Sequence, residues 1–285
     1  MPNFPIVDSH VHLYDVARLS YPWMANVPQI GASHLPADFA RACGPVEVDT
    51  IVFEEVDVAA GQSVAEARFV AELAQSDPRI RGIVASARME RGAAVREELD
   101  ALAETGLLKG IRRLIQDQPD PEFCLRQNFV EAVRLLPGYG VAFDVCVRHP
   151  QLQNAIAFMR KCPDVRFVLN HLGKPGIKDG LVEPWKTQIR EIARMPNVVC
   201  KISGVITEAD HRHWTREQVR PYIEHCLNYF GFDRALYGGD WPVVELAGSY
   251  PQWVETLDWI VAGASEAERR MLYRDTAIRV YSLPA

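Results

Sequence analysis

The stretch Ile6-Val7-Asp8-Ser9-His10-Val11-His12-Leu13 is a short apolar run that ends in two histidines separated by one residue. Side chains alternate between the two faces of an extended strand, so His10 and His12 project to the same side, roughly 7 Å apart. Two imidazoles at that spacing can share one small centre. The stretch therefore predicts a strand that delivers two histidines to a site.

A pair of histidines with this spacing has little specificity by itself. With 8 histidines in 285 residues, such a pair arises by chance about one time in five. A second pair, His211 and His213, occurs among polar residues with no strand-like run before it. The first pair differs because it follows Pro5-Ile6-Val7, a run typical of a buried strand.

Length and composition indicate a single globular domain. Of the 285 residues, 48% are hydrophobic and 24% are charged, which is ordinary for a protein with a large core. Closed α/β barrels reach this length as one domain, and two small domains are the alternative. The net charge of −6 favours neither nucleic acid nor an anionic membrane surface as a partner.

The cysteines and the N-terminal segment bear on the compartment. Six cysteines lie far apart and form no Cys-x-x-Cys pair, so we expect buried thiols in a reducing environment. Residues 1–5 lack the features of a secretory signal, and no apolar run approaches the roughly 20 residues that span a bilayer. We therefore expect a cytoplasmic protein with no membrane association; the sequence does not indicate its oligomeric state.

From residue 36 onward the chain repeats one pattern, in which β-branched apolar runs and amphipathic helices alternate. Strands after the first are predicted at 50–53, 80–86, 107–115, 141–147, 166–171, 198–203 and 235–238. Helices are predicted at 36–43, 63–75, 93–104, 121–136, 150–160, 184–194, 215–230, 250–261 and 265–281. Eight strand-then-helix units predict an α/β protein, a single-domain (β/α)8 TIM barrel. An open doubly wound sheet is the alternative, but no glycine-rich turn follows the first strand.

In such a barrel, active sites are built at the C-terminal ends of the strands. Polar side chains do follow most of the predicted strands, in this order: His10 and His12, Glu54-Glu55, Arg112-Arg113, Arg148-His149, Asn170-His171, Lys201-Ile202-Ser203 and Asp240. We expect two imidazoles, a third from across the barrel and a lone carboxylate to meet at one point.

The order and register of these motifs resemble the amidohydrolase superfamily. They are most similar to a branch of TIM-barrel hydrolases that includes sugar lactonases, such as L-fuconolactonase and L-rhamnonolactonase, and a pyrone dicarboxylate lactonase. The resemblance covers nearly the whole chain and rests on Asp8-Ser9-His10-Val11-His12, Tyr21-Pro22-Trp23, Gly110-Ile111-Arg112 with Gln116-Asp117, Phe143-Asp144, Asn170-His171-Leu172-Gly173-Lys174-Pro175, Cys200-Lys201-Ile202-Ser203-Gly204 and Gly239-Asp240-Trp241-Pro242.

The resemblance implies that His10, His12, His171 and Asp240 surround the reacting centre. Binuclear members of the superfamily use a carboxylated lysine at the end of the fourth strand, whereas Lys109 lies near the start of that strand. We therefore expect at most one divalent metal ion, with zinc the expected metal, on His10, His12 and Asp240. This branch also resembles proteins that dispense with a metal, so metal-free catalysis remains open.

The expected reaction is the hydrolysis of a sugar-derived, L-fuconolactone-like lactone to the sugar acid. Asp240 is the expected general base on the attacking water, and a metal ion, His171 or both polarise the carbonyl. The substrate's hydroxyls and ring require polar side chains and aromatic faces. The candidate substrate-binding residues are Trp23, His34, Glu55, Arg112, Arg113, Lys174 and Trp241. Trp23 and His34 belong to a long loop at 14–35, and loops of that length are usually functional.

Three alternatives stay open at this point. A metal-dependent nonoxidative decarboxylase of an aromatic acid would use the same barrel without an attacking water. A non-catalytic barrel that binds carbohydrate is a function of another class. For Arg112 and Arg113, strand alternation lets either one face the site, and an ion pair with Asp144 would be a purely structural role.

Overall fold

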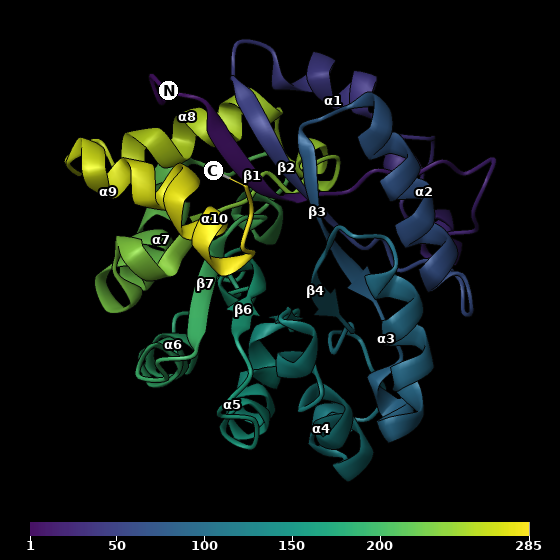
Figure 1. Ribbon diagram of the computed structural model, residues 1–285. Coiled ribbons are helices and arrows are strands. Elements are labelled where there is room, and N and C mark those ends of the chain that lie inside the picture. Colours follow the sequence, from purple (N-terminus) through teal and green to yellow (C-terminus); the bar gives the residue numbers. More distant parts are fainter. Residues whose placement is uncertain (285) are drawn as a thin grey trace.

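The computed structural model describes residues 1–284 and contains eight parallel strands that neighbour one another in chain order (Figure 1). The strands are β1 (Ile6–Val11), β2 (Val48–Glu54), β3 (Ile80–Ser86), β4 (Leu108–Arg112), β5 (Ala142–Val145), β6 (Phe167–Leu169), β7 (Val198–Ile202) and β8 (Ala235–Tyr237). One helix follows each strand: α1 (Pro36–Cys43), α2 (Ser63–Ser76), α3 (Arg96–Ala103), α4 (Gln127–Val133), α5 (Leu152–Arg160), α6 (Trp185–Ala193), α7 (Arg216–Phe230) and α8 (Tyr250–Ile260). The helices ring the strands, which confirms the predicted (β/α)8 barrel.

Several predicted elements are shorter in the structure. The helix predicted at 121–136 begins as a 3-10 turn at Phe123–Leu125 and is α-helical only in α4. The helix predicted at 93–104 is preceded by a 3-10 segment, Met89–Val95. The single helix predicted at 265–281 is divided in the structure into α9 (Glu266–Arg270), a π-helical turn and α10 (Thr276–Val280). Strand β6 ends at Leu169, two residues earlier than expected.

The barrel closes between β1 and the segment after β8 through one buried carboxylate. Asp8 Oδ1 accepts hydrogen bonds from the backbone N–H groups of His10 at 3.0 Å and Gly239 at 2.8 Å. Asp8 Oδ2 accepts from the Tyr250 hydroxyl at 2.8 Å. A Cβ atom at Gly239 would lie 2.3 Å from that same carboxylate, so only glycine lets the chain approach so closely. Burial raises the pKa of Asp8 to about 6, and these hydrogen bonds oppose the shift.

Two backbone hydrogen bonds extend this closure toward the C-terminal ends of the strands. The N–H of Asp240 donates to the carbonyl of His10 at 2.8 Å, and the N–H of His12 donates to the carbonyl of Trp241 at 2.8 Å. The strand-one histidines and Asp240 are therefore fixed to each other by main-chain bonds.

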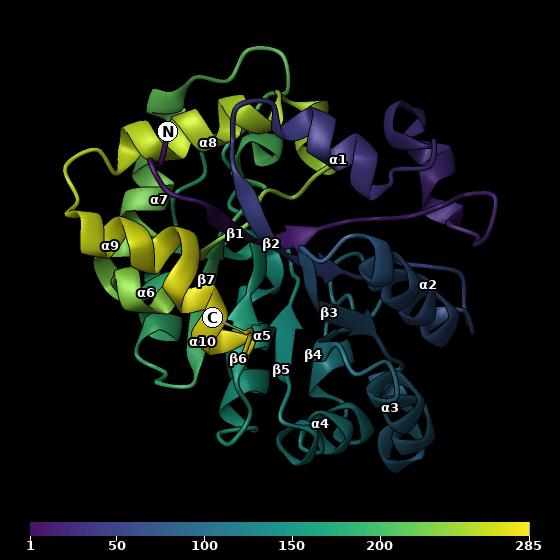
Figure 2. The same ribbon diagram turned by 45° about the horizontal axis from the view of Figure 1, so that its top comes forward.

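The C-terminal segment closes the opposite end of the barrel (Figure 2). Its buried side chains are Ala277, Val280, Tyr281 and Leu283, and they pack against side chains that point into the barrel from the strands, such as Val7 and Val168. Lys109 also lies at this end, where its ammonium group donates to the carbonyl of Ser282 at 3.2 Å. As expected from its place in the strand, it points away from the site.

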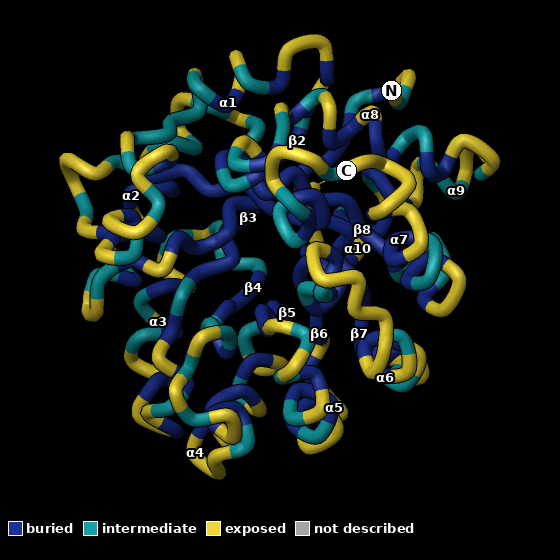
Figure 3. Tube along the Cα trace, turned by 180° about the vertical axis from the view of Figure 1, so that it is seen from behind, coloured by how far each residue is buried: buried dark blue, intermediate teal, exposed yellow. Residues whose placement is uncertain are grey.

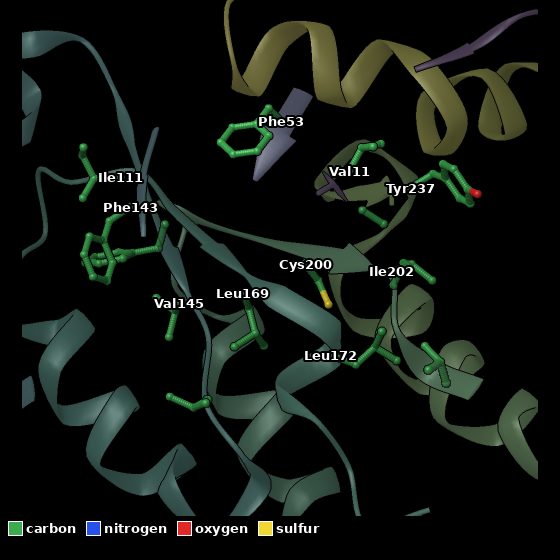
Figure 4. Close-up of a cluster of buried hydrophobic side chains, with 14 of the residues drawn as sticks. Val11, Phe53, Ile111, Phe143, Val145, Leu169, Leu172, Cys200, Ile202 and Tyr237 are labelled. Carbon is green, nitrogen blue, oxygen red and sulfur yellow. The ribbon is translucent and has the colours of Figure 1, made fainter. Parts of the chain in front are cut away.

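A second apolar layer lies between the strands and the surrounding helices. Figure 4 shows Phe143, Val145 and Leu169 among the side chains of this layer. Phe143 and Phe158 contact each other edge to face, with ring centroids 5.7 Å apart. The trace is buried along the strands and exposed mainly on the outer sides of the helices (Figure 3).

All six cysteines are buried free thiols, as the sequence predicted. Within residues 1–284, no helix has the length and apolar character that crossing a membrane requires.

Replacing Asp8 with alanine should destabilise the fold because it leaves two buried N–H groups and one buried hydroxyl without their acceptor. We expect the free energy of unfolding to fall by about 3 kcal/mol or more, at roughly 1–3 kcal/mol for each unsatisfied buried group. Tyr250→Phe is the matched control and removes one of these bonds, at about 1 kcal/mol. Urea unfolding followed by circular dichroism measures both, and equal losses would contradict a closing role for Asp8.

Candidate active site

Four predicted residues meet at the C-terminal end of the strands. His10 Nε2 and His12 Nε2 are 3.2 Å apart. Asp240 Oδ1 lies 3.5 Å from His10 Nε2 and 3.4 Å from His12 Nε2. His171 Nδ1 lies 3.9 Å from Asp240 Oδ2. The structure thus brings together side chains from β1, from the turn after β6 and from the segment after β8.

The backbone at two of these residues adopts an uncommon conformation. His171 has a φ angle of 54° and Asp240 one of 57°, in the left-handed region that side chains other than glycine seldom occupy. Between them lies Gly204, where a Cβ atom would come within 2.6 Å of His171 Nδ1 and 2.7 Å of Asp240 Oδ2. Strain of this kind is retained where the surrounding structure imposes it, and it clusters at functional sites.

Burial and local charge set the protonation of the site. Burial lowers the pKa of His10 well below its ordinary value, and the nearby Lys201 ammonium adds to the shift. Burial also lowers the pKa of His171 to about 3, against the opposing effect of Asp240. Burial alone would raise the pKa of Asp240, but His171 and His12 outweigh it and leave the pKa below its usual range. At neutral pH the site therefore holds an ionised carboxylate beside the neutral imidazoles of His10 and His171.

Hydrogen bonds orient the imidazoles. His12 Nδ1 lies 2.9 Å from the carbonyl oxygen of Glu54, which can only accept, so Nδ1 carries the proton and Nε2 has a free lone pair. His171 Nδ1 lies 2.9 Å from the hydroxyl of Ser203. Ser203 contacts the site but had no predicted role, although it lies in a strand-end motif.

His10, His12 and Asp240 have the donor atoms and spacing of a metal site. Their nearest nitrogen and oxygen atoms all lie within 4.8 Å of one another. A tetrahedral zinc centre with ligand bonds of about 2.0–2.1 Å has neighbouring donor atoms roughly 3.3 Å apart, close to the 3.2–3.5 Å separations measured between these residues. The three residues therefore fit one divalent ion.

Of the two adjacent arginines, Arg112 faces the site. Its Nε lies 2.5 Å from Glu55 Oε1, its Nη2 donates to the Glu55 carbonyl at 2.6 Å, and its Nη1 is 3.4 Å from His10 Nε2. Arg113 points to the outside of the barrel wall and donates two hydrogen bonds to Glu90, at 3.0 and 2.8 Å. Alternation along β4 turns only one of the pair inward, so Arg113, unlike Arg112, does not line the cavity above the site.

A cavity of about 550 Å³ opens above these residues. Trp23, Arg112 and Lys174 line it, as predicted for substrate-binding residues. The loop after β1 supplies much of the apolar wall, including Val27 and Ile30. The long loop at 14–35 therefore forms part of the wall of this cavity.

Three other predicted substrate-binding residues lie outside this cavity. Glu55 is buried and paired with Arg112. Trp241 is buried too, and its indole N–H donates to Glu245 at 2.8 Å. His34 packs against the Trp241 ring, with centroids 5.1 Å apart. None of the three side chains lines the cavity, and the polar groups of Glu55 and Trp241 are already paired with protein groups.

Comparison with known proteins identifies the family of this chain. The sequence model of the family described as Amidohydrolase matches residues 7–283. An L-fucono-1,5-lactonase of Burkholderia multivorans is 32% identical over 290 aligned residues, which cover 98% of this chain and 96% of the relative. An L-rhamnono-gamma-lactonase of Scheffersomyces stipitis is 24% identical and is covered over its full length (100%), against 99% of this chain.

A solved structure shows the same architecture. It is an amidohydrolase from Burkholderia multivorans with bound zinc, and it superposes with a TM-score of 0.88 at 30% identity, covering 99% of this chain and 100% of that chain. The family match includes both the strand-one histidines and Asp240. This chain belongs to the amidohydrolase family.

Proposed function

We propose that this protein hydrolyses a sugar-derived lactone of the L-fuconolactone type to the corresponding sugar acid. The observation that carries the proposal is a cluster at the base of a cavity of about 550 Å³, in which the carboxylate of Asp240 lies 3.4–3.9 Å from the imidazoles of His10, His12 and His171. Ester hydrolysis needs a base for water and a donor for the developing oxyanion, and both kinds of group are present. The relatives named as sugar lactonases support the class of reaction.

In this mechanism Asp240 takes the proton of the attacking water while the new C–O bond forms at the lactone carbonyl. Its depressed pKa keeps it ionised and ready to accept the proton. Where the Ser203 hydroxyl donates to His171 Nδ1, the proton of His171 is on Nε2, which is then a donor to the carbonyl oxygen. The ring C–O bond breaks as the proton is returned from Asp240 to the leaving oxygen.

We also propose that His10, His12 and Asp240 hold a single divalent ion, with zinc as the expected metal because a related structure contains it. When bound, such an ion lowers the pKa of a water and polarises a carbonyl oxygen. The hydrogen bond from His12 Nδ1 to the Glu54 carbonyl directs Nε2 toward that position.

Substrate hydroxyls are proposed to contact Arg112 and Lys174, and a face of the sugar to contact Trp23. The indole N–H of Trp23 donates to the carbonyl of Val56 at 2.7 Å, which holds the ring at the cavity wall. A fixed ring offers an apolar face at little cost in conformational entropy.

Assays of acid release from a panel of aldonolactones should identify at least one substrate. Asp240→Asn keeps the shape of the side chain but removes the base, so we expect kcat to fall by about 10²–10⁴-fold with the fold intact. Asp117→Asn is the control, because Asp117 lines the same cavity but pairs with Arg148. Hydrolysis of no lactone, or an Asp240→Asn variant as fast as the wild type, would overturn the proposal.

Metal analysis of protein purified without chelators should find one divalent ion per chain. His12→Ala should weaken zinc affinity by more than the roughly 10–100-fold that follows loss of an outer-shell partner, measured by competition with a chromophoric chelator. The control is His213→Ala, which alters the exposed second histidine pair. Equal affinity in both variants would show that the strand-one pair does not bind the ion.

A further inference from the structure

A continuous chain of buried polar groups links the C-terminal segment to the strand-one histidines. The Tyr281 hydroxyl donates to Asp144 at 2.8 Å, and the Lys201 ammonium donates to Asp144 at 2.7 Å and to Glu54 at 2.8 Å. The side chains of Lys201, Asp144 and Glu54 are fully buried. Asp144 therefore pairs with a lysine, and the arginine partner considered from the sequence is wrong.

Glu54 stands between this network and the active site. Its Oε2 is 3.5 Å from His10 Nδ1, and its Oε1 is 3.2 Å from Arg112 Nε. Its backbone carbonyl holds His12 Nδ1. A single residue at the end of β2 thus faces the outer nitrogen of both strand-one imidazoles.

His10 needs an acceptor on that side. A neutral imidazole carries one N–H, and Nε2 of His10 lies 3.4 Å from Arg112 Nη1, which can only donate, so Nε2 is the acceptor atom of the ring. The proton must then be on Nδ1, a buried atom with no hydrogen-bond partner among the described residues. The Glu54 carboxylate, 3.5 Å away, becomes that partner after a movement of a few tenths of an ångström.

The network is also costly as a purely structural core. Removing carboxylates and an ammonium from water carries a desolvation penalty, and apolar side chains of similar volume often fill such a space with equal or greater stability. The inward-facing neighbours of these residues in the barrel are apolar, for example Val52 and Val199. Charges at this place therefore point to a task other than packing.

We propose that Glu54 is a positioning residue, which fixes His10 in the tautomer with its proton on Nδ1. Lys201 and Asp144 hold the Glu54 carboxylate in place, and Tyr281 anchors them from the plugged end of the barrel. The C-terminal segment then closes one end of the barrel and also helps to hold the active-site residues at the other end in place. The inference rests on the proposed function for the reaction and the metal affinity that would be impaired. The tautomer of His10 depends on neither the substrate nor the ion.

The first test compares Glu54→Gln with the wild type. The substitution keeps the shape of the side chain and removes its charge. We expect zinc affinity and kcat each to fall by about tenfold or more, with KM changed by less than about twofold. In metal-free protein labelled with ¹⁵N-histidine, the His10 signals should change from a single Nδ1-protonated tautomer to a mixture of tautomers.

The second test covers the case in which Glu54→Gln does not fold. Tyr281→Phe removes only the hydroxyl that anchors Asp144, and we expect zinc affinity to fall by roughly fivefold, the factor of one buried hydrogen bond. Tyr273→Phe is the matched control. The buried hydroxyl of Tyr273 lies in the π-helical turn of the same C-terminal region and has no hydrogen-bond partner among residues 1–284. That variant should keep the wild-type affinity.

Two results would overturn the inference. One is a folded Glu54→Gln protein with the wild-type tautomer, zinc affinity and kcat. The other is an equal effect of Tyr281→Phe and Tyr273→Phe. The tautomer and zinc measurements use no lactone, so failure of this inference is distinguishable from failure to find a lactone substrate.

Discussion

The structure depends on the hydrogen bonds that Asp8 makes across the seam between β1 and the segment after β8. A sheet of eight strands has two edges until its first and last strands are joined, and here a carboxylate makes much of that joint. The same seam carries the bond from the Asp240 N–H to the His10 carbonyl. The bonds that close the barrel therefore also position the residues of the active site. The raised pKa of Asp8 reflects its burial at this seam.

The two ends of this barrel differ in chemistry for a physical reason. At the N-terminal end of the strands, the segment that includes Val280 and Leu283 covers apolar side chains and excludes water. At the other end, short strands give way to turns, and the left-handed backbone of His171 and Asp240 turns their side chains over the opening. Both residues lie beyond the last residue of their strands, where the chain is free to leave the extended conformation.

The buried ion pairs connect the two ends. Lys201 reaches Glu54 and Asp144 across the inside of the barrel, which joins β7 to β2 and β5. Because charged groups in such surroundings are costly unless they are fully paired, the geometry of each depends on the others. A substitution at the end of the barrel that the C-terminal segment closes should consequently alter the position of the histidines, although no substrate reaches that end.

The sequence by itself determined the architecture, and its resemblance to the amidohydrolase superfamily indicated His10, His12, His171 and Asp240 as the central residues. Strand and helix periodicities are local properties, and the rule that strand ends converge in a closed barrel turns local motifs into a site. Only the tertiary structure decided that Arg112 and not Arg113 faces inward, that Trp241 is buried in the wall, and that Glu54 meets Lys201, 147 residues away in the chain. Those outcomes depend on where each strand ends and on which side chains lie opposite one another across the barrel, and neither is encoded in the spacing of residues along the chain.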